Sequence, residues 1–569
     1  MKKRKLKLTS IKKRVFGMPH SLWILIQWFL ILSGVTMTMT TTLRGSAAEG
    51  IACVLLSLVV YIWLAFRKEL LERIVSDFSI PCGLIALAFA IDAAGKFMDF
   101  FYFRFDKLAQ MLSAFLSDGL SMDAEAIIAF IGLAKVVISC ITGMVLCFAA
   151  YLLCDWVRRF VLPIIRGLTG MEIAYWASTV VLSIVFIFFV YHYTDLFYYP
   201  SVDGQVVLYD AVFSTETGVL MQTDVFVNIN ATENDLFRPL FGLYSMPFGI
   251  AASWIASLFG GELTAYALAL AGMQVAALSF SIILLSRLLE LRDIDQFCFL
   301  MLYFISYPAL LFVLNIEHLV FGQFWLSLYL YSICRKEPDQ EAWTEVSFSA
   351  AAGTSLGSGF FLLFSLEKGG LKHNGRILYR SMLTFLAFMI SFGQLPILTS
   401  AGEALKALFL SAGTDIPWQD KLWRYLAFIH NCLLSPAVET VSAYAYTSYQ
   451  QQYAAGPDRI GILLLAFALL GFIVNRRKKY SLICLSWLLL SFLLLGLTGW
   501  NAQDSNTILY SFSFSWALLS LLYMGFSRVL AKWPLLRLLI ATAAFFVMAA
   551  INIKGIRELI LFGATHYPR

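Results

Sequence analysis

The sequence predicts an all-α, polytopic transmembrane helical protein with about 13 spans. Of its 569 residues, 60% are hydrophobic and only 14% are charged, whereas soluble globular chains average about 45–50% apolar and about 25% charged residues. The apolar residues fall in runs of roughly twenty, the length that a helix needs to cross the hydrocarbon core. Because lipid cannot pair with backbone amides, such runs must be helices, and the alternation of a β-barrel is missing from the pattern.

The N-terminal part begins with a basic tail and continues with four predicted spans. Residues 1–14 hold eight Lys or Arg and no acid, which favours a topology signal or a contact with anionic lipid over an RNA-binding arm. The first span, 21–43, is longer than a typical signal-peptide core and has no clear cleavage site, so we expect a retained anchor. The net charge of +6 does not indicate nucleic acid, because the basic residues cluster at span ends.

The basic loops also predict the orientation, since short loops rich in Lys and Arg stay in the cytoplasm. They place the N-terminus in the cytoplasm and the C-terminus on the extracytoplasmic side of the cell membrane. Segment 239–258 would put Arg287 and Arg292 outside if it crossed, so we predict that it lies along or dips into the outer leaflet. Segment 346–366 has GTSLGSG at its centre and basic flanks, which predicts a broken, re-entrant hairpin, with a full span as the alternative.

The most informative stretch runs from residue 193 to residue 238 and faces outside. It carries a single base, Arg238, and seven acids: Asp195, Asp203, Asp210, Glu216, Asp224, Glu233 and Asp235. A cation or a cationic ligand would relieve the repulsion among these acids. The sequence therefore allows a divalent metal, although it requires no cofactor. Two further polar segments, the turn 315–318 and the loop 500–506, are predicted on the same side.

The order of these features resembles the GT-C fold, the polytopic glycosyltransferases that use polyprenyl-phosphate sugars. That family has a large outer loop with an essential Asp near its start, then a stretch written as His- or Lys-Pro-Pro-Leu, and later a second acid at an outer turn. Here Tyr199-Pro-Ser-Val-Asp203-Gly and Tyr209-Asp210 stand where the first acid belongs. Phe237-Arg-Pro-Leu-Phe241 stands at the Pro-Leu stretch, and Asn315-Ile-Glu317-His318 at the second acid.

The resemblance covers about residues 172–400, or at its widest extends to residue 530, and departs from the family in two ways. A single Pro follows Arg instead of a Pro pair, and no adjacent Asp-Glu pair opens the loop. We therefore expect a basic tail with four spans over residues 1–170, a GT-C-like core over 171–400, and an outer loop with C-terminal spans over 401–569. The four N-terminal spans are additional to the family core and are predicted not to be catalytic.

By resemblance, the chain would be an inverting glycosyltransferase acting on the extracytoplasmic face. It would move a sugar from a polyprenyl-phosphate donor to a cell-envelope acceptor. Asp203 or Asp210 would be the base, and if their stretch is helical, both would face one cleft. Glu317 would be a second polar contact or metal ligand, and Arg238 would bind the phosphate. Further candidate substrate contacts are His318, Asp195, Asn501 and Asp504.

Each of these residues also has a structural interpretation. An acid in a solvated outer loop is often only solvated, and Glu233 and Asp235 would cap a helix that opens at Arg238. His318 would be a polar residue at a helix start, and the loop 500–506 an interfacial Trp followed by a polar turn. GTSLGSG has no Lys in a phosphate-loop position, so we interpret it as a helix break and not as a nucleotide site.

Two other function classes compete with sugar transfer. A transporter or flippase of a lipid-linked glycan or polar solute would use charges inside the spans, namely Asp92, Lys96 and Lys135. A non-catalytic assembly or sensor protein is the third class. The partners that the sequence implies are a lipid-linked sugar donor and membrane lipid, without nucleic acid, and the oligomeric state stays open.

Overall fold

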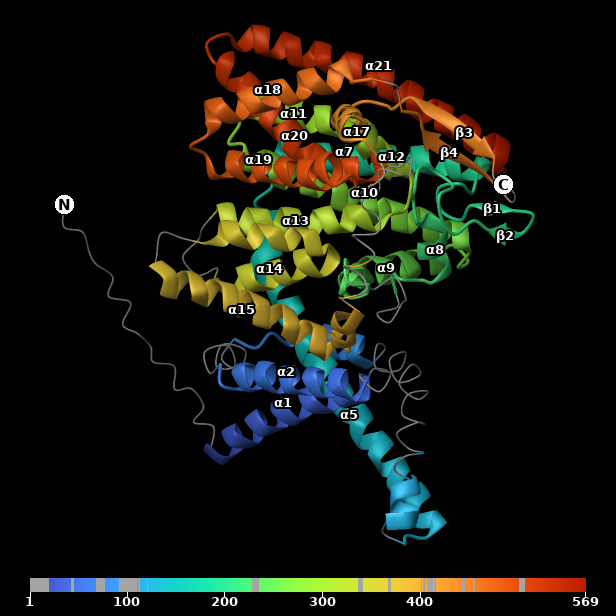
Figure 1. Ribbon diagram of the computed structural model, residues 1–569, viewed down its shortest axis with the longest axis vertical. Coiled ribbons are helices and arrows are strands. Elements are labelled where there is room, and N and C mark those ends of the chain that lie inside the picture. The colour runs from blue at the N-terminus through green and yellow to red at the C-terminus, as the bar shows by residue number, and fades with distance from the viewer. Residues whose placement is uncertain are drawn as a thin grey trace, which may run out of the picture. The chain divides into compact units, whose positions relative to one another are not determined.

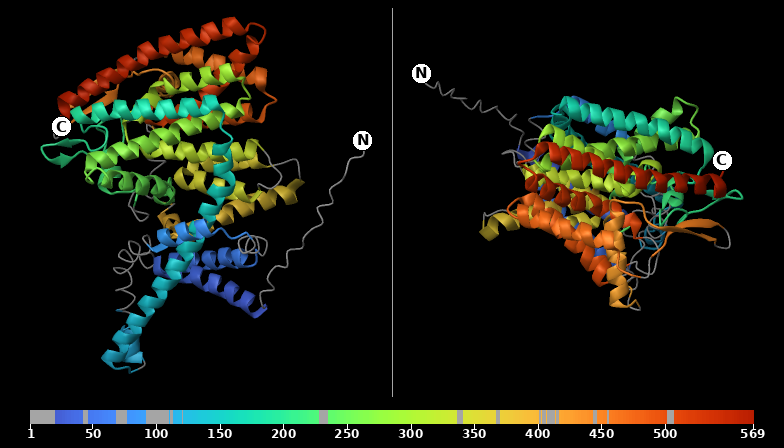
Figure 2. Two further views of the ribbon diagram at one scale, coloured as in Figure 1. Left: turned by 180° about the vertical axis from the view of Figure 1, so that it is seen from behind. Right: turned by 90° about the horizontal axis from the view of Figure 1, so that it is seen from above.

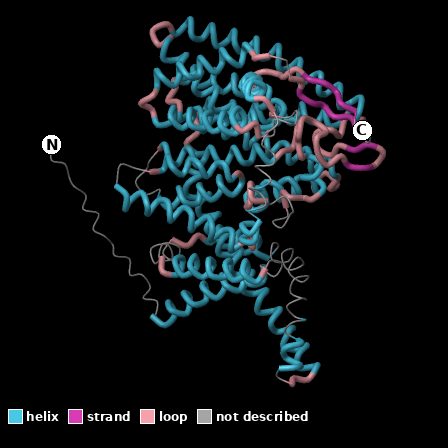
Figure 3. Tube along the Cα trace, in the orientation of Figure 1, coloured by secondary structure: helices cyan, strands magenta, loops and turns pink. Residues whose placement is uncertain are grey.

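The protein is almost entirely helical (Figure 3). The computed structural model describes residues 20–41, 46–67, 77–91, 110, 113–119, 121–227, 235–335, 341–366, 370–400, 402, 406, 413, 416–442, 446–453, 456–500 and 507–569. Within these ranges the named strands form two antiparallel hairpins. One pairs β1 (Ser201–Val202) with β2 (Gln205–Val206), and the other pairs β3 (Val438–Ser442) with β4 (Thr447–Gln451).

The chain divides into two compact units. The first comprises residues 1–162 and 383–399, and the second comprises residues 163–382 and 400–569. The first unit contains α1 (His20–Thr41), α2 (Ala47–Ala65), α5 (Ala124–Trp156), the π-helical turn η1 (Val157–Val161) and the end of α15 (Gly370–Ser391). Its core joins Tyr61 to Ile390, and the Tyr61 hydroxyl lies 2.8 Å from Ser391 Oγ.

The second unit contains most of the helices of the described chain, including the first part of α15 (Figure 1). These helices are α6 (Leu162–Arg166), α7 (Gly170–Tyr193), α8 (Thr217–Gln222), α9 (Phe241–Ser257), α10 (Leu263–Leu288), α11 (Asp293–Phe304), α12 (Tyr307–Leu314), α13 (His318–Cys334), α14 (Glu341–Thr354), the 3₁₀ helix η2 (Leu356–Ser365), the 3₁₀ helix η3 (Leu395–Ser400, shared with the first unit), α17 (Trp418–Asn431), α18 (Arg459–Asn475), α19 (Lys479–Ser491), the π-helical η4 (Phe492–Leu497), α20 (Ile508–Val529) and α21 (Pro534–His566).

The protein is an all-α, multi-pass membrane protein. Within the described ranges, seven helical segments are long and apolar enough to cross a membrane: α2, α5 with its extension to Arg166, α7, α10, α19 with η4, α20 and α21. The pair α11 and α12, bent by 62°, would make an eighth. The sequence predicts about 13 spans, and several of these are shorter helices in the structure, such as α13 and α18 with 17 residues each.

Burial separates the central helices of the second unit from the peripheral ones. α10 and α20 are buried along most of their length, whereas α7 and α21 expose most of their apolar side chains, as expected for helices that face lipid. α21 forms an outer layer of this unit (Figure 2). α18 crosses α20 closely at Gly471, where an added Cβ would lie 2.1 Å from Leu521 O, so only glycine permits this backbone approach.

Ion pairs and backbone contacts define the two ends of the second unit. At the basic end, Arg287 Nη2 lies 2.6 Å from Glu172 Oε2 and Arg537 Nη2 lies 2.6 Å from Asp295 Oδ2. Lys478 Nζ lies 3.1 Å from Glu290 Oε2 at the same end. At the opposite, acidic-loop end, Thr194 Oγ1 donates to Tyr567 O (2.7 Å). α7 and α21 therefore both finish at the acidic-loop end.

Candidate functional site

A buried amide organises the turn that joins α12 to α13 at the acidic-loop end. Gln274 on α10 is fully buried, and its Nε2 donates to Phe312 O (2.6 Å) and to Asn315 O (2.8 Å). Its Oε1 accepts the Glu317 N–H at 3.0 Å. One side chain thus satisfies three backbone groups that would otherwise lose their hydrogen bonds at a helix break. These three hydrogen bonds hold the turn in place.

Glu317 is the acid that this turn presents, and it faces the protein interior. It is 0% exposed. Its Oε1 accepts the Glu216 N–H at 2.5 Å, and its Oε2 accepts the His318 N–H at 3.2 Å. Burial raises the pKa of Glu317 to about 7, although these two hydrogen bonds and the charge of Arg238 act in the opposite direction. Glu317 therefore fixes the backbone of Glu216.

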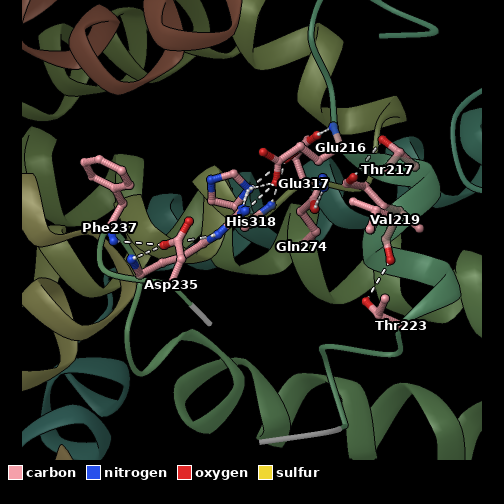
Figure 4. A network of polar contacts seen from close by, with 11 residues as sticks. Glu216, Thr217, Val219, Thr223, Asp235, Phe237, Gln274, Glu317 and His318 are labelled. Carbon is pink, nitrogen blue, oxygen red and sulfur yellow. Dashed lines mark hydrogen bonds and ion pairs between the residues drawn. The ribbon is translucent and has the colours of Figure 1, made fainter. Parts of the chain in front are cut away.

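Arg238 connects the acids of the loop to α13, in a polar network of which Figure 4 labels Glu216, Glu317 and His318. Its Nη2 lies 2.6 Å from Glu216 Oε2, and its Nη1 lies 2.9 Å from His318 Nδ1. Burial, reinforced by the charge of Arg238, lowers the pKa of His318 to about 3. The imidazole is therefore neutral, and its Nδ1 lone pair accepts from Arg238. The guanidinium is thus oriented from two sides.

Asp235 fixes the backbone that carries Arg238. Its Oδ1 accepts the N–H groups of Phe237 (2.9 Å) and Arg238 (3.0 Å). The sequence predicts this capping role for Asp235, but the helix that follows, α9, begins at Phe241 and not at Arg238. Glu233, the other predicted cap, lies outside the described residues.

These charged groups stand at one end of a cavity of about 590 Å³ in the second unit. Glu216, Asp235, Arg238 and His318 form its polar end. Most of the remaining wall is apolar or aromatic and comes from α13, η2, α19, η4, α20 and two loop residues, Phe237 and Trp500. The helical residues are Leu319, Leu326, Leu356, Trp487, Leu490, Leu494, Leu495, Leu509, Tyr510, Phe514 and Trp516. The cavity is therefore amphipathic, with one charged end and one long apolar side.

The GTSLGSG segment forms part of this wall. α14 ends at Thr354 and η2 begins at Leu356, so the helix breaks where the sequence predicts a break. Leu240 N–H donates to Gly353 O (2.8 Å), and Leu356 N–H donates to Phe237 O (2.7 Å). These bonds hold the break against the loop that carries Arg238. Ser355, Gly357 and Ser358 consequently line the cavity.

The structure brings together some of the residues that the sequence singles out. Arg238 and His318 line the cavity, and Glu317 lies directly behind them. Asp203, Asp210 and Asp195 do not line it. Asn501 and Asp504 lie outside the described residues, although Trp500, which precedes them, lines the cavity.

The stretch from Asp203 to Asp210 is not helical, which corrects one expectation. Asp203 occupies the turn of the β1–β2 hairpin with φ 51°, and Asp210 has φ 62° in a later turn. Two such left-handed residues interrupt any helical spacing, so the seven-residue separation does not place both acids on one face. Asp203 is exposed. Asp210 lies near Tyr446, and the pKa of Tyr446 is raised mainly by burial and further by the charge of Asp210.

Asp195 does not line the cavity and instead makes hydrogen bonds within the loop and to the end of the chain. It follows the end of α7, its N–H donates to Tyr567 O (3.3 Å), and its Oδ2 accepts from Ser201 Oγ (2.7 Å). Burial raises its pKa, against the hydrogen bond from Ser201. These contacts join the start of the acidic loop to the end of α21.

Three residues of this site were not predicted from the sequence: Glu216, Gln274 and Ser355. Glu216 was one acid among seven, and only the fold shows that it, with Asp235, reaches the cavity. Gln274 lies in the middle of an apolar span, and a single amide in such a span is a pattern that could have marked it as a candidate. Ser355 lies in the segment that we interpreted only as a helix break.

Of the three charged residues that a transporter would use, the structure describes only Lys135. Lys135 lies on α5 in the first unit and does not line the cavity. Asp92 and Lys96 lie outside the described residues.

The buried carboxyl of Glu317 predicts a pH-dependent stability. Its pKa is about 7 in the folded protein against an ordinary 4.5, so folding favours the protonated form. The resulting stabilisation is fully present below pH 4.5 and is lost as the pH rises to 7, a difference of about 3 kcal/mol. We expect the melting temperature of the wild type in detergent to fall relative to that of Glu317→Gln over this range. Parallel melting curves of the two proteins would contradict the assignment.

No group of three or more His, Cys, Asp and Glu side chains is arranged to hold a metal ion within the ranges that the structure describes. A divalent metal stays a prediction from the acidic loop.

Comparison of the chain with known protein families, with curated proteins and with solved structures finds no match.

Proposed function

We propose that this protein is a membrane glycosyltransferase of the GT-C type, which transfers a sugar from a polyprenyl-phosphate donor to a cell-envelope acceptor. The amphipathic cavity is the observation that carries the proposal. A lipid-linked sugar phosphate has a charged head and a long apolar tail, and the cavity offers Arg238 at one end and apolar and aromatic walls along the rest. Guanidinium is the side chain best suited to phosphate oxygens.

The chemistry requires a base close to Arg238, and we propose Glu216 for this role. An acceptor hydroxyl oxygen bonds to the anomeric carbon while the bond between that carbon and the phosphate oxygen breaks. The bonding electrons leave with the phosphate, which Arg238 stabilises, and the hydroxyl proton passes to the carboxylate. Glu216 lines the cavity and is held by Glu317 through its own N–H.

The position of Glu216 favours this residue as the base over Asp203 and Asp210. Neither of the latter lines the cavity, and a base must come within about 3 Å of the proton that it removes or act through one water. Asp235 also lines the cavity, but its Oδ1 is engaged by two backbone N–H groups. In this proposal Glu317 is a positioning residue, because it touches the Glu216 backbone and does not line the cavity.

We further propose that the basic end of the second unit is cytoplasmic and that the acidic-loop end is extracytoplasmic, with about 13 spans in total. Arg287 Nη2 donates to Gly167 O (2.7 Å), so the start of α7 and the end of α10 lie at the same end. This supports the prediction that segment 239–258 does not cross, because α7 and α10 alone account for one passage in each direction. It also supports a C-terminus at the extracytoplasmic end, where α21 finishes.

Single cysteines at Arg292 and at Arg476, each introduced into a background without the nine native cysteines, test this topology. We expect both to react with a membrane-impermeant maleimide only after the membrane is opened. A cysteine at Asp203 should react in intact cells and serves as the control. Labelling of Arg292→Cys in intact cells would reverse the assignment and weaken the GT-C proposal.

Sugar transfer is tested with the full chain purified into lipid vesicles. A panel of radiolabelled polyprenyl-phosphate sugars is supplied with cell-envelope extract as acceptor, and label transferred to the acceptor supports the proposal. The alternative, a transporter or flippase, predicts movement of label across the bilayer without transfer, and loss of that movement in Lys135→Met. Transport without transfer from any donor would replace the proposal.

A further inference from the structure

A second cavity, of about 810 Å³, is lined by α7, α10 and the end of α9, and shares no lining residue with the amphipathic cavity. Of these helices, α7 and α10 run side by side (Figure 2). Its lining on α10 runs from Glu262 to Ala276, about 21 Å at a rise of about 1.5 Å per residue. That length exceeds the depth of one leaflet, about half of a hydrocarbon core of about 30 Å.

Small side chains along α10 leave the space for this cavity. Along α10 they recur at spacings of four, three and four residues: Ala265, Ala269, Gly272 and Ala276. The opposite wall is formed by larger apolar residues of α7, such as Val180, Ile184 and Phe188. Trp176 Nε1 donates to Ala276 O (2.9 Å) and joins the two helices at the inner limit. The result is an apolar slot with the dimensions of an extended hydrocarbon chain.

The outer end of the slot carries opposite charges. Glu262, the first residue before α10, and Arg569 both line it and both are exposed. Arg569 is held beside the end of α7, where its Nη1 donates to Tyr191 O (3.4 Å) and its N–H to Tyr193 O (3.4 Å). Two other titratable groups face this end: His192, which lines the slot, and Asp195, whose carboxylate interacts with the charge of Arg569.

The charges at the outer end of the slot favour some lipid headgroups over others. A lipid with only a negative phosphate would meet Arg569 but would also meet Glu262 and Asp195, which repel it. A zwitterionic headgroup satisfies both signs, with its phosphate on Arg569 and its cationic amine on Glu262. A primary ammonium has three N–H donors for the carboxylate, whereas a trimethylated amine has none.

We propose that the α7–α10 slot binds a bilayer phospholipid with a phosphoethanolamine headgroup, one acyl chain lying along Ala265, Ala269 and Gly272. The site is separate from the amphipathic cavity and does not depend on sugar transfer. The bound lipid lies along two helices that also contact each other directly through Trp176 and Ala276, and it stabilises α7, which leads directly into the acidic loop.

The proposal is tested by native mass spectrometry of the purified full chain after delipidation and titration with phosphatidylethanolamine, phosphatidylcholine or phosphatidylglycerol of matched chains. We expect phosphatidylethanolamine to bind most tightly. Glu262→Gln should reduce its preference over phosphatidylglycerol by about fivefold, whereas Arg569→Gln should weaken all three phospholipids. Ala269→Phe should abolish retention by filling the slot.

Val185→Phe is the matched control for Ala269→Phe, because Val185 is an exposed residue of α7 that does not line the slot. It should retain lipid like the wild type. The proposal fails if Ala269→Phe retains phosphatidylethanolamine as the wild type does. It fails equally if the three lipids bind alike, or if Glu262→Gln leaves the preference unchanged.

Discussion

Glu216→Gln is expected to lower the turnover number for sugar transfer by about 10²–10⁴-fold, the usual contribution of a general base. The amide keeps the size of the side chain, and the Glu216 N–H still donates to Glu317, so the loop should keep its fold. Donor binding should persist, because the loss of a negative charge beside Arg238 does not remove the phosphate contact. The measurement is steady-state transfer in vesicles, with donor KM and the turnover number determined separately.

Asp203→Asn is the matched control, since Asp203 lies in the same loop but occupies the exposed turn of the β1–β2 hairpin. It should keep transfer near the wild-type rate. If Asp203→Asn or Asp210→Asn is inactive while Glu216→Gln is active, the base belongs to the earlier part of the loop, as the sequence alone predicts.

Arg238→Gln is expected to reduce kcat/KM for the donor by about 10–100-fold, the value of a hydrogen bond to a charged group. Much of this loss should appear as a higher donor KM, because the guanidinium contacts the phosphate before and during transfer. Removal of the cation also leaves Glu216 without its ion pair at 2.6 Å, so the melting temperature should fall. Arg238→Lys should restore part of the binding but not the two-sided geometry set by Glu216 and His318.

Arg476→Gln, at the exposed basic end, is the control for a general loss of charge and should leave donor kinetics unchanged. A folded Arg238→Gln with wild-type donor KM and turnover would show that the guanidinium serves only the structure of the loop. Addition of inorganic pyrophosphate gives a further check, since it should inhibit the wild type more strongly than Arg238→Gln.

Composition and apolar runs determined that this protein is helical and multi-pass, because a membrane leaves the backbone few other ways to pair its amides. Local chemistry also determined the capping of the Arg238 turn by Asp235, which depends on neighbouring residues only, and the glycines of GTSLGSG indicated the helix break near Ser355. The resemblance to the GT-C order of polar segments singled out Arg238, Glu317 and His318 as candidates.

Only the tertiary structure decided which acids share a cavity. Glu216 and Glu317 are 101 residues apart, and their contact depends on α8, α10 and the turn after α12 meeting in space. The apolar wall likewise combines α13, η2, η4 and α20, which no sequence spacing relates. The backbone turns at Asp203 and Asp210, which separate these acids from the cavity, depend on left-handed conformations that the residue types allow but do not require. Long-range packing, and not local propensity, therefore placed the proposed site.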